Sequence, residues 1–417
     1  MTLRTHHVLL WGATGFTGAL VAEELVRRYG VGKQLRWALG GRSRAKLEAV
    51  RDGLAKLDPA AADLAIVTGD AADRESLDRV AQSASVVCST VGPYAVHGAP
   101  LVAACVESGT DYCDLTGEPQ FVRAMIDAHH ARAKDTGARI VHCCGFDSIP
   151  SDLGTLVVQQ AARDGGAGGC REVKCFVLKV KGALSGGTVA SMVQVMEEAT
   201  SDPEVRRVLM DPYALDPDRG ERGPDGPDPV GVAWDEDLRS WTAPFVMAAI
   251  NMRVVRRTNA LLGYAWGKDF RYRETLAFGE GAGAWGKAAG VTTGMAIGLA
   301  GAAIGPLRRL AAKRFLPTSG QGPSREQRER GSFELRLLGL PREGKDNVVV
   351  TVRGKGDPGY AATATMLAES AVCLALDGDR ISKEGGVRTP GSTLGLPLVD
   401  RLRRAGIAFD VGPAPAV

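Results

Sequence analysis

A glycine-rich loop near the start of the chain constrains the fold more than any other feature of the sequence. An apolar segment, residues 7–11, leads directly into Gly12, Gly15 and Gly18, and residues 16–29 have the apolar spacing of a helix. A phosphate that binds at such a turn needs backbone N–H donors and no Cβ atoms in its way, and a helix N-terminus adds partial positive charge. The loop lies between strand and helix, as a dinucleotide-binding loop must, although G-x-x-G-x-x-G is a variant of the usual fingerprint.

We therefore predict that the loop binds the phosphates of a nucleotide, the alternative being a glycine-rich turn without a ligand. The residues expected to contact the cofactor here are Gly12, Ala13, Thr14, Gly15, Phe16, Thr17 and Gly18.

Strand-like and helix-like segments alternate through the first 150 residues. Further strands are expected at residues 35–39, 64–68, 85–91, 110–115 and 139–144, and helices at residues 44–57, 74–81, 100–107 and 118–136. This order predicts an α/β fold with a Rossmann-like, doubly wound parallel sheet. Residues 1–150 are thus expected to form a dinucleotide-binding domain.

The pattern changes after residue 150. Strands of a second, mainly antiparallel sheet are expected at residues 171–181, 271–278, 333–338 and 347–352. A long apolar helix is expected at residues 360–376. We predict that residues 151–355 form an α+β domain for substrate binding or dimerisation, and that residues 356–417 return to complete the first domain.

The residues after the second predicted strand indicate which dinucleotide binds. NAD enzymes usually have an acidic residue there for the ribose hydroxyls, whereas this chain has Arg42 and Ser43. A guanidinium can bind a 2′-phosphate with two hydrogen bonds, so we predict NADP(H) as the cofactor, with a solvated basic turn as the alternative. Residues at the ends of the third and fourth strands complete the predicted cofactor site: Asp70, Val91, Gly92 and Pro93.

Side chains near the ends of two further strands are candidates for acid–base chemistry, because ligands in this fold bind beyond the carboxyl ends of the strands. A phenol can both donate and accept a proton, so Tyr94 or Tyr112 is the predicted proton donor. For Tyr94, simple packing of an aromatic ring is an equally weighted alternative. Asp114 and Glu118 are candidate acid–base or anchoring groups.

The loop at residues 144–152 is also polar. Asp147, Ser148 and Ser151 are candidates to cap the helix that follows. We favour a capping role for Ser148 and Asp152.

The composition argues against several other classes of protein. The chain has 417 residues, of which 51 are basic and 48 acidic, so its net charge of +3 does not suggest a nucleic-acid-binding surface. The eight cysteines include no C-x-x-C pair and the six histidines form no metal-binding motif, so we predict no metal site. The N-terminus lacks the apolar stretch of a signal peptide, and scattered cysteines are typical of a reducing compartment, so we expect a cytoplasmic protein.

One segment, residues 288–307, contains no charged side chain and is long enough to cross a bilayer as a helix. Gly286, Gly290, Gly294 and Gly298 recur at every fourth position, and such a face suits close contact between helices. We favour a helix that is buried or packed in a homodimer. The alternative is contact with a membrane or lipid surface, at the inner face of the plasma membrane.

Together these motifs resemble the saccharopine dehydrogenase-like oxidoreductases, and they are most similar to the trans-acting enoyl reductases of mycobacterial type. The resemblance covers nearly the whole chain and is carried by residues 12–18, 41–43, 91–94, 111–118, 144–152, 185–188, 251–261, 271–275 and 322–331. It implies an NADP-binding domain with a substrate domain. It also implies reduction of a carbon–carbon double bond on an acyl or polyketide lipid intermediate that a separate synthase holds.

Two other functions stay open from the sequence. The first is a dehydrogenase acting on C–N bonds, as saccharopine enzymes do, which would need basic residues to bind substrate carboxylates. The candidates for that role are Arg253, Arg256, Arg257, Arg271 and Arg273. The second is a non-catalytic, membrane-associated protein that binds a nucleotide.

Overall fold

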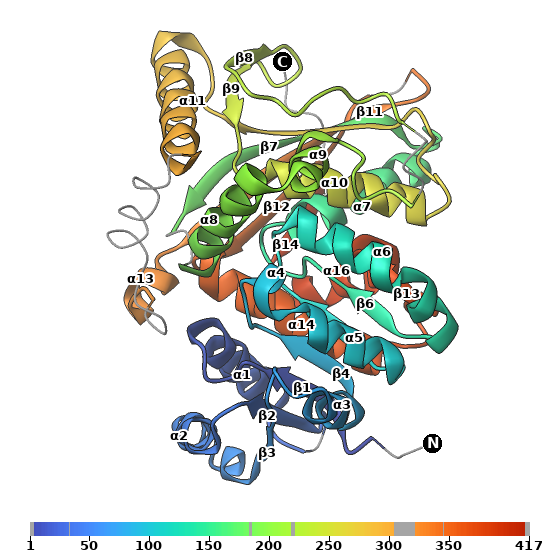
Figure 1. The fold of residues 1–417 in the computed structure, drawn as a ribbon. Coiled ribbons are helices and arrows are strands. Elements are labelled where there is room, and N and C mark those ends of the chain that lie inside the picture. The colour runs from blue at the N-terminus through green and yellow to red at the C-terminus, as the bar shows by residue number, and fades with distance from the viewer. Residues whose placement is uncertain are drawn as a thin grey trace.

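The computed structural model describes residues 4–32, 34–182, 186–217, 222–303, 322–344 and 346–412. These residues form two seven-stranded sheets, which we call sheet A and sheet B, with helices packed around and between them (Figure 1).

Sheet A is parallel throughout, in the order β13-β6-β5-β4-β1-β2-β3. Its strands are β1 (His6–Trp11), β2 (Trp37–Gly41), β3 (Ala65–Thr68), β4 (Ala84–Ser89), β5 (Asp111–Asp114), β6 (Arg139–Val141) and β13 (Gly386–Arg388). From β1 the chain adds β2 and β3 on one side and then β4, β5 and β6 on the other, so the strand order reverses between β1 and β4. Doubly wound sheets bind their ligands at this point. The predicted Rossmann-like sheet is confirmed.

Helices connect these strands as the alternation predicts. They are α1 (Phe16–Tyr29), α2 (Arg44–Ala55), α3 (Arg74–Gln82), α4 (Tyr94–His97), α5 (Ala99–Glu107) and α6 (Pro119–Thr136), with a short turn of 3₁₀ helix at Pro59–Asp63. The fourth strand ends at Ser89, earlier than predicted, so Thr90 and Val91 belong to the loop above the sheet. The second strand extends to Gly41, because the glycines pair with β1 and β3.

Sheet B has the order β14-β12-β11-β7-β10-β9-β8 and is antiparallel except where β10 pairs with β7. Its strands are β7 (Cys170–Lys181), β8 (Ala233–Asp235), β9 (Ser240–Pro244), β10 (Arg271–Ala277), β11 (Ser332–Pro341), β12 (Val348–Lys355) and β14 (Ala408–Gly412). The predicted second sheet is thus present, but β8, β9 and β14 were not foreseen, because segments this short carry almost no periodicity.

The helices of this part of the chain are α7 (Ile149–Asp164), α8 (Gly186–Ser201), α9 (Pro203–Met210), α10 (Ala248–Leu261), α11 (Gly281–Ala303) and α13 (Arg325–Glu329). The C-terminal part forms α14 (Thr363–Leu376), preceded by a π-helical turn at Pro358–Ala362, then α15 (Pro390–Thr393) and α16 (Gly395–Arg404). After α14 the chain adds β13 to sheet A, whereas the last strand, β14, joins sheet B.

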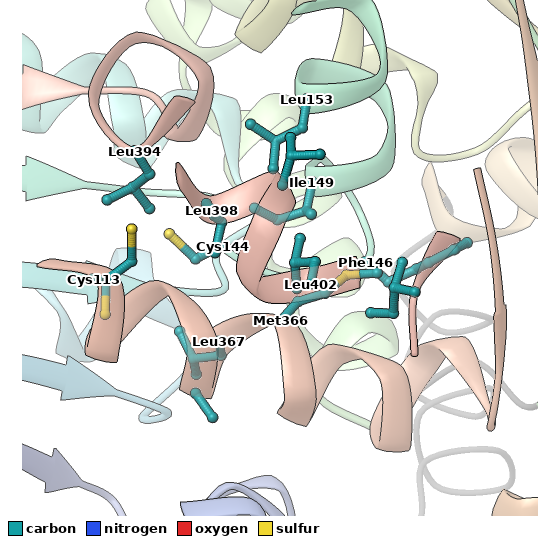
Figure 2. Packing of buried hydrophobic residues seen from close by; sticks show 14 of the residues in the cluster. Cys113, Cys144, Phe146, Ile149, Leu153, Met366, Leu367, Leu394, Leu398 and Leu402 are labelled. Carbon is teal, nitrogen blue, oxygen red and sulfur yellow. The ribbon is translucent and has the colours of Figure 1, made fainter. Parts of the chain in front are cut away.

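A continuous apolar core joins the two sheets around α14 (Figure 2). Met366 and Leu367 of α14 are fully buried, as are Leu398 of α16 and Leu153 of α7. Pro358–Leu376 is the one helical stretch in the described part of the chain that is long and apolar enough to cross a membrane, but 78% of it is buried. Packing in the core therefore accounts for its apolar composition.

The glycine-rich helix α11 does not lie in that core. It stands at the edge of the molecule in Figure 1 and packs on β9 and α8. Ala284 and Ala288 are buried against these neighbours, whereas Trp285 and Ile297 are exposed to 51% and 68%. The described part of α11 is therefore not buried within this chain, and its packing in a homodimer stays a prediction. Residues 304–307 lie outside the described residues.

Candidate cofactor and active site

The glycines of the loop between β1 and α1 are required by close backbone contacts. Gly12 has φ of +91°, and a Cβ atom there would lie 2.7 Å from both Thr90 Oγ1 and Val91 Cγ2. A Cβ atom on Gly18 would lie 2.2 Å from the carbonyl oxygen of Gly12. Side chains at either position would force α1 away from the end of β1, so these glycines fix where the helix begins.

The N-terminus of α1 is left available to an anion. Gly15 is the N-cap residue, so no side chain caps the first N–H groups, and the first turn contains no acidic residue. Thr14 and Gly15 are exposed, whereas Ala13 is buried beneath them. N–H donors that no described side chain caps, the positive end of the helix and the lack of Cβ atoms at the glycines together fit the pyrophosphate of a dinucleotide.

Residues distant in sequence pack around Phe16, the first residue of α1. The Phe16 ring packs edge-on against Tyr360, with the centroids 4.9 Å apart, and the Arg328 guanidinium lies 5.3 Å from the Phe16 centroid. The Tyr360 hydroxyl accepts a hydrogen bond of 2.9 Å from the backbone N–H of Gly186, at the start of α8. Sequence reasoning missed these neighbours, and only the glycine pair at residues 186–187 hinted at a close backbone approach there.

Arg42 and Ser43 lie where β2 ends and α2 begins. Arg42 is exposed and forms no hydrogen bond or ion pair with any described residue. The Ser43 hydroxyl caps α2 by accepting from Lys46 N at 3.5 Å, a weak bond that leaves its proton free to donate. Asp70 is exposed and accepts a hydrogen bond from Ala72 N, which shapes the turn after β3. The arrangement suits an additional phosphate near Arg42.

We expect Arg42→Ala to weaken NADPH binding about tenfold to a hundredfold while leaving NADH binding unchanged. The reason is that a charge-assisted hydrogen bond contributes about 1.5–3 kcal/mol. Titration of each cofactor by nicotinamide fluorescence measures both dissociation constants. Equal affinity of wild type and variant for NADPH would show that Arg42 does not contact the 2′-phosphate.

The predicted proton donors lie inside the core. Tyr94 and Tyr112 are 3% and 0% exposed, and the Tyr94 hydroxyl donates to the carbonyl oxygen of Ser89 at 3.0 Å. Burial raises the pKa of both phenols well above the usual value. Tyr94 is thus surrounded by protein, as the alternative of simple aromatic packing predicts. The assignment of Tyr94 or Tyr112 as the proton donor stays a prediction.

Asp114 is also enclosed. Its carboxyl accepts hydrogen bonds from the backbone N–H groups of Thr116 and Cys143, at 3.1 and 3.3 Å, and lies 2.7 Å from His142 Nδ1. The side chain is fully buried. These contacts hold together the loops after β5 and β6. Asp114 thus has the surroundings of an anchoring group, which is one of the two roles considered for it.

Glu118 connects three parts of the site. Its carboxyl accepts hydrogen bonds from Tyr94 N at 2.9 Å and Ala95 N at 2.7 Å, at the start of α4 and directly after the loop that contains Gly92 and Pro93. It also accepts a hydrogen bond of 2.6 Å from Ser191 Oγ on α8. Glu118 is fully buried, so the loop beside the predicted nicotinamide position is fixed from within the protein.

The capping roles favoured for Ser148 and Asp152 are wrong. Ser148 occupies the N-cap position of α7, but its hydroxyl donates to Asn251 Oδ1 at 2.9 Å. Asp152 accepts hydrogen bonds of 2.6 Å from Thr258 Oγ1 and from Gly391 N. Both side chains therefore join α7 to other elements of the fold, and burial raises the pKa of Asp152 to about 7.

Comparison with known proteins agrees with this geometry. Residues 8–141 match the family described as the saccharopine dehydrogenase NADP binding domain. A Mycobacterium tuberculosis protein that is provisionally named a trans-acting enoyl reductase is 45% identical over 416 residues, with 98% of each chain covered. The trans-acting enoyl reductase of Mycobacterium ulcerans is 42% identical over 413 residues, with 97% of each chain covered.

Among solved structures, the apo saccharopine dehydrogenase of Saccharomyces cerevisiae aligns with 97% of this chain at 14% identity, with a TM-score of 0.48 and 99% of that chain covered. Because the mycobacterial relatives match from end to end above 40% identity, the relationship extends over both sheets. This chain therefore belongs to the saccharopine dehydrogenase-like oxidoreductases, alongside the mycobacterial trans-acting enoyl reductases, and is an NADP-dependent oxidoreductase.

Proposed function

We propose that this protein is an enoyl reductase that uses NADPH to reduce a carbon–carbon double bond of an acyl or polyketide lipid intermediate carried by a separate synthase. The observation that carries the proposal is the end-to-end identity of 41–45% with proteins named trans-acting enoyl reductases. The proposal is also supported by the exposed glycine loop after β1, which lies where the strand order of sheet A reverses and where this fold binds nucleotides.

NADPH, when bound, supplies the hydride for such a reduction. The chain's own residues orient it: the α1 N-terminus binds the pyrophosphate and Arg42 the 2′-phosphate. Glu118 holds the loop at Gly92–Ala95, where the nicotinamide end of the cofactor would lie. Together these groups would hold the cofactor at the carboxyl ends of the strands of sheet A.

The fold does not favour the alternative of C–N bond chemistry. Arg253 is paired with Asp228 at 2.8 Å, and Arg256 with Asp225 at 2.7 Å. Arg257 donates to the carbonyl oxygens of Leu215 and Val387.

These three guanidiniums are buried and serve the fold, so they do not form the carboxylate-binding pocket that an amino-acid substrate would need. Arg271 is exposed at the start of β10, and Arg273 on the same strand pairs with Glu172 and Asp235, each at 3.3 Å.

A path for a long acyl chain is supported by the arrangement of α8 and α11. Ser191 of α8 contacts Glu118 at the cofactor edge, and α11 packs along α8. The described part of α11 exposes Trp285, Ile297 and Leu299. We infer that these apolar side chains receive the lipid part of the substrate, or a second copy of the protein, beside the reacting end.

The test is oxidation of NADPH in the presence of enoyl thioesters of increasing chain length, with the saturated thioester of the same length as control. We expect NADPH consumption and a product heavier by two hydrogen atoms with the enoyl substrate only. Binding of NADPH without consumption across the series would contradict the proposal. Consumption with an oxo acid and an amine would identify the C–N dehydrogenase instead.

A further inference from the structure

The loop after β6 contains a carboxyl group, that of Asp147, with no hydrogen-bond partner among the described residues. Its other members are held by tertiary contacts: Cys144 N donates to Asp114 O at 2.7 Å, Phe146 N donates to Thr363 Oγ1 at 3.0 Å, and the Ser148 hydroxyl donates to Asn251. The Phe146 ring points into the core and packs on Phe333, with centroids 4.9 Å apart (Figure 2). Between these fixed neighbours, the Asp147 carboxyl accepts no hydrogen bond from any described residue.

Asp147 lies at the edge of sheet A where a substrate would reach the cofactor. A Cβ atom built on Gly117 would be 3.7 Å from Asp147 Oδ2 and 3.1 Å from Met247 Cε, so the carboxyl lies beside the loop after β5. Gly117 immediately precedes Glu118, which fixes the loop at the predicted nicotinamide end. The loops after β4, β5 and β6 therefore converge, and Asp147 belongs to this group.

The surroundings of Asp147 favour a carboxyl group that is still partly protonated near neutral pH. Asp147 remains partly exposed, yet burial raises the pKa of its carboxyl to about 6, with no charged partner contributing. The Cys143 thiol feels the charge of Asp147: its pKa is raised by burial first, and also by Asp114, Cys144 and Asp147. A catalytic acid works best when its pKa lies close to the operating pH.

The other candidate acids at this edge are either paired with other groups of the protein or fully buried. The Tyr94 hydroxyl donates to Ser89 O, and the Asp114 and Glu118 carboxyls each receive several donors from the protein. Tyr112 is fully buried and points into the core cluster. Among the side chains that the sequence placed at these strand ends, Asp147 combines an unpaired carboxyl with access to the ligand side.

We propose that Asp147 is the proton donor of the reduction, an inference that rests on the proposed enoyl reductase function. Hydride addition to the β-carbon shifts the π electrons of the double bond towards the α-carbon and the thioester oxygen. The Asp147 O–H bond then breaks, and its proton forms the new C–H bond at the α-carbon. The resulting carboxylate regains a proton from solvent, so each turnover consumes one NADPH and one proton.

The decisive variant is Asp147→Asn, which keeps the shape of the side chain but cannot deliver the proton. We expect kcat with an enoyl thioester to fall about 10²–10⁴-fold, with NADPH affinity unchanged. In wild type, kcat/KM should decline as pH rises through about 6, because only the protonated carboxyl is active, and this limb should vanish in the variant.

Asp216→Asn is the matched control. Burial raises the pKa of Asp216 to about 7 as well, but it lies near Arg257, whereas Asp147 lies near Met247 at the other end of α10. The two positions on α10 are about 15 Å apart at the helical rise per residue. Turnover should be unchanged by the control substitution, and equal losses in both variants would indicate a structural effect and overturn the assignment.

A measurement without turnover separates this inference from the proposed function. The infrared difference spectrum between wild type and Asp147→Asn reports the protonated carboxyl directly as pH is varied. A carboxyl that titrates near 6 and shifts when NADPH is added supports the inference even if no enoyl substrate is reduced. A carboxyl that titrates near 4, like a solvated aspartate, overturns it even if the protein proves to be an enoyl reductase.

Discussion

Replacement of Gly18 by alanine should weaken NADPH binding about tenfold to a hundredfold and lower the free energy of unfolding by about 1–3 kcal/mol. The new methyl group would lie 2.2 Å from the Gly12 carbonyl oxygen, well inside van der Waals contact with backbone that cannot easily move. Relief of this contact requires α1 to shift away from β1, which displaces the N–H donors of its first turn. Cofactor titration and thermal unfolding in the absence of cofactor measure the two effects.

Gly53→Ala provides the matched control. Gly53 also lies in a helix, α2, but a Cβ atom there would meet nothing within 4 Å. We expect unchanged cofactor affinity and a gain of about 0.5–1 kcal/mol in stability, because alanine restricts the unfolded chain and favours the helix. If both substitutions left cofactor binding intact, the phosphate-binding assignment of the α1 N-terminus would have to be abandoned.

Substitution of Glu118 by alanine should cost at least about 3 kcal/mol of unfolding free energy and a large part of the activity. Its removal leaves the buried N–H group of Tyr94 without its acceptor, together with the partly buried Ala95 N–H group and Ser191 hydroxyl. The loop beside the nicotinamide would then lose its fixed position, so kcat should fall more than cofactor affinity. Glu118→Gln keeps one acceptor oxygen, so it should lose less unfolding free energy and less activity than Glu118→Ala.

Ser191→Ala separates the contribution of α8 from that of the loop. It removes a single hydrogen bond to Glu118 and leaves both backbone donors satisfied, so we expect a cost of only about 0.5–1.5 kcal/mol. Chemical denaturation and steady-state kinetics on the three variants would apportion the effect. An equal loss from Ser191→Ala and Glu118→Ala would show that contact with α8, and not support of the loop, is the important function of this carboxyl.

The sequence by itself determined the fold class and the close approach of backbone at the glycine loop. Both follow from local rules: the apolar spacing of 7–11 and 16–29 specifies a strand and a helix, and three glycines between them specify a close backbone approach. The alternation up to residue 150 then determines a parallel sheet, because a helix between two strands carries the chain back so that both strands run in the same direction. Short strands such as β8 and β13 were not predicted, because three residues are too few to show the alternation of apolar and polar side chains that marks a strand.

The tertiary structure decided which polar groups are free to act. Local sequence places Tyr94, Asp114, Glu118 and Asp147 alike at strand ends, and gives no indication of what lies opposite each. In the folded chain Glu118 meets two backbone N–H groups and α8, Asp114 meets His142, and Asp147 meets no donor among the described residues. The burial and the hydrogen-bond partners of each carboxyl group depend on residues that are distant in the sequence. They decide whether the carboxyl anchors a loop or can transfer a proton.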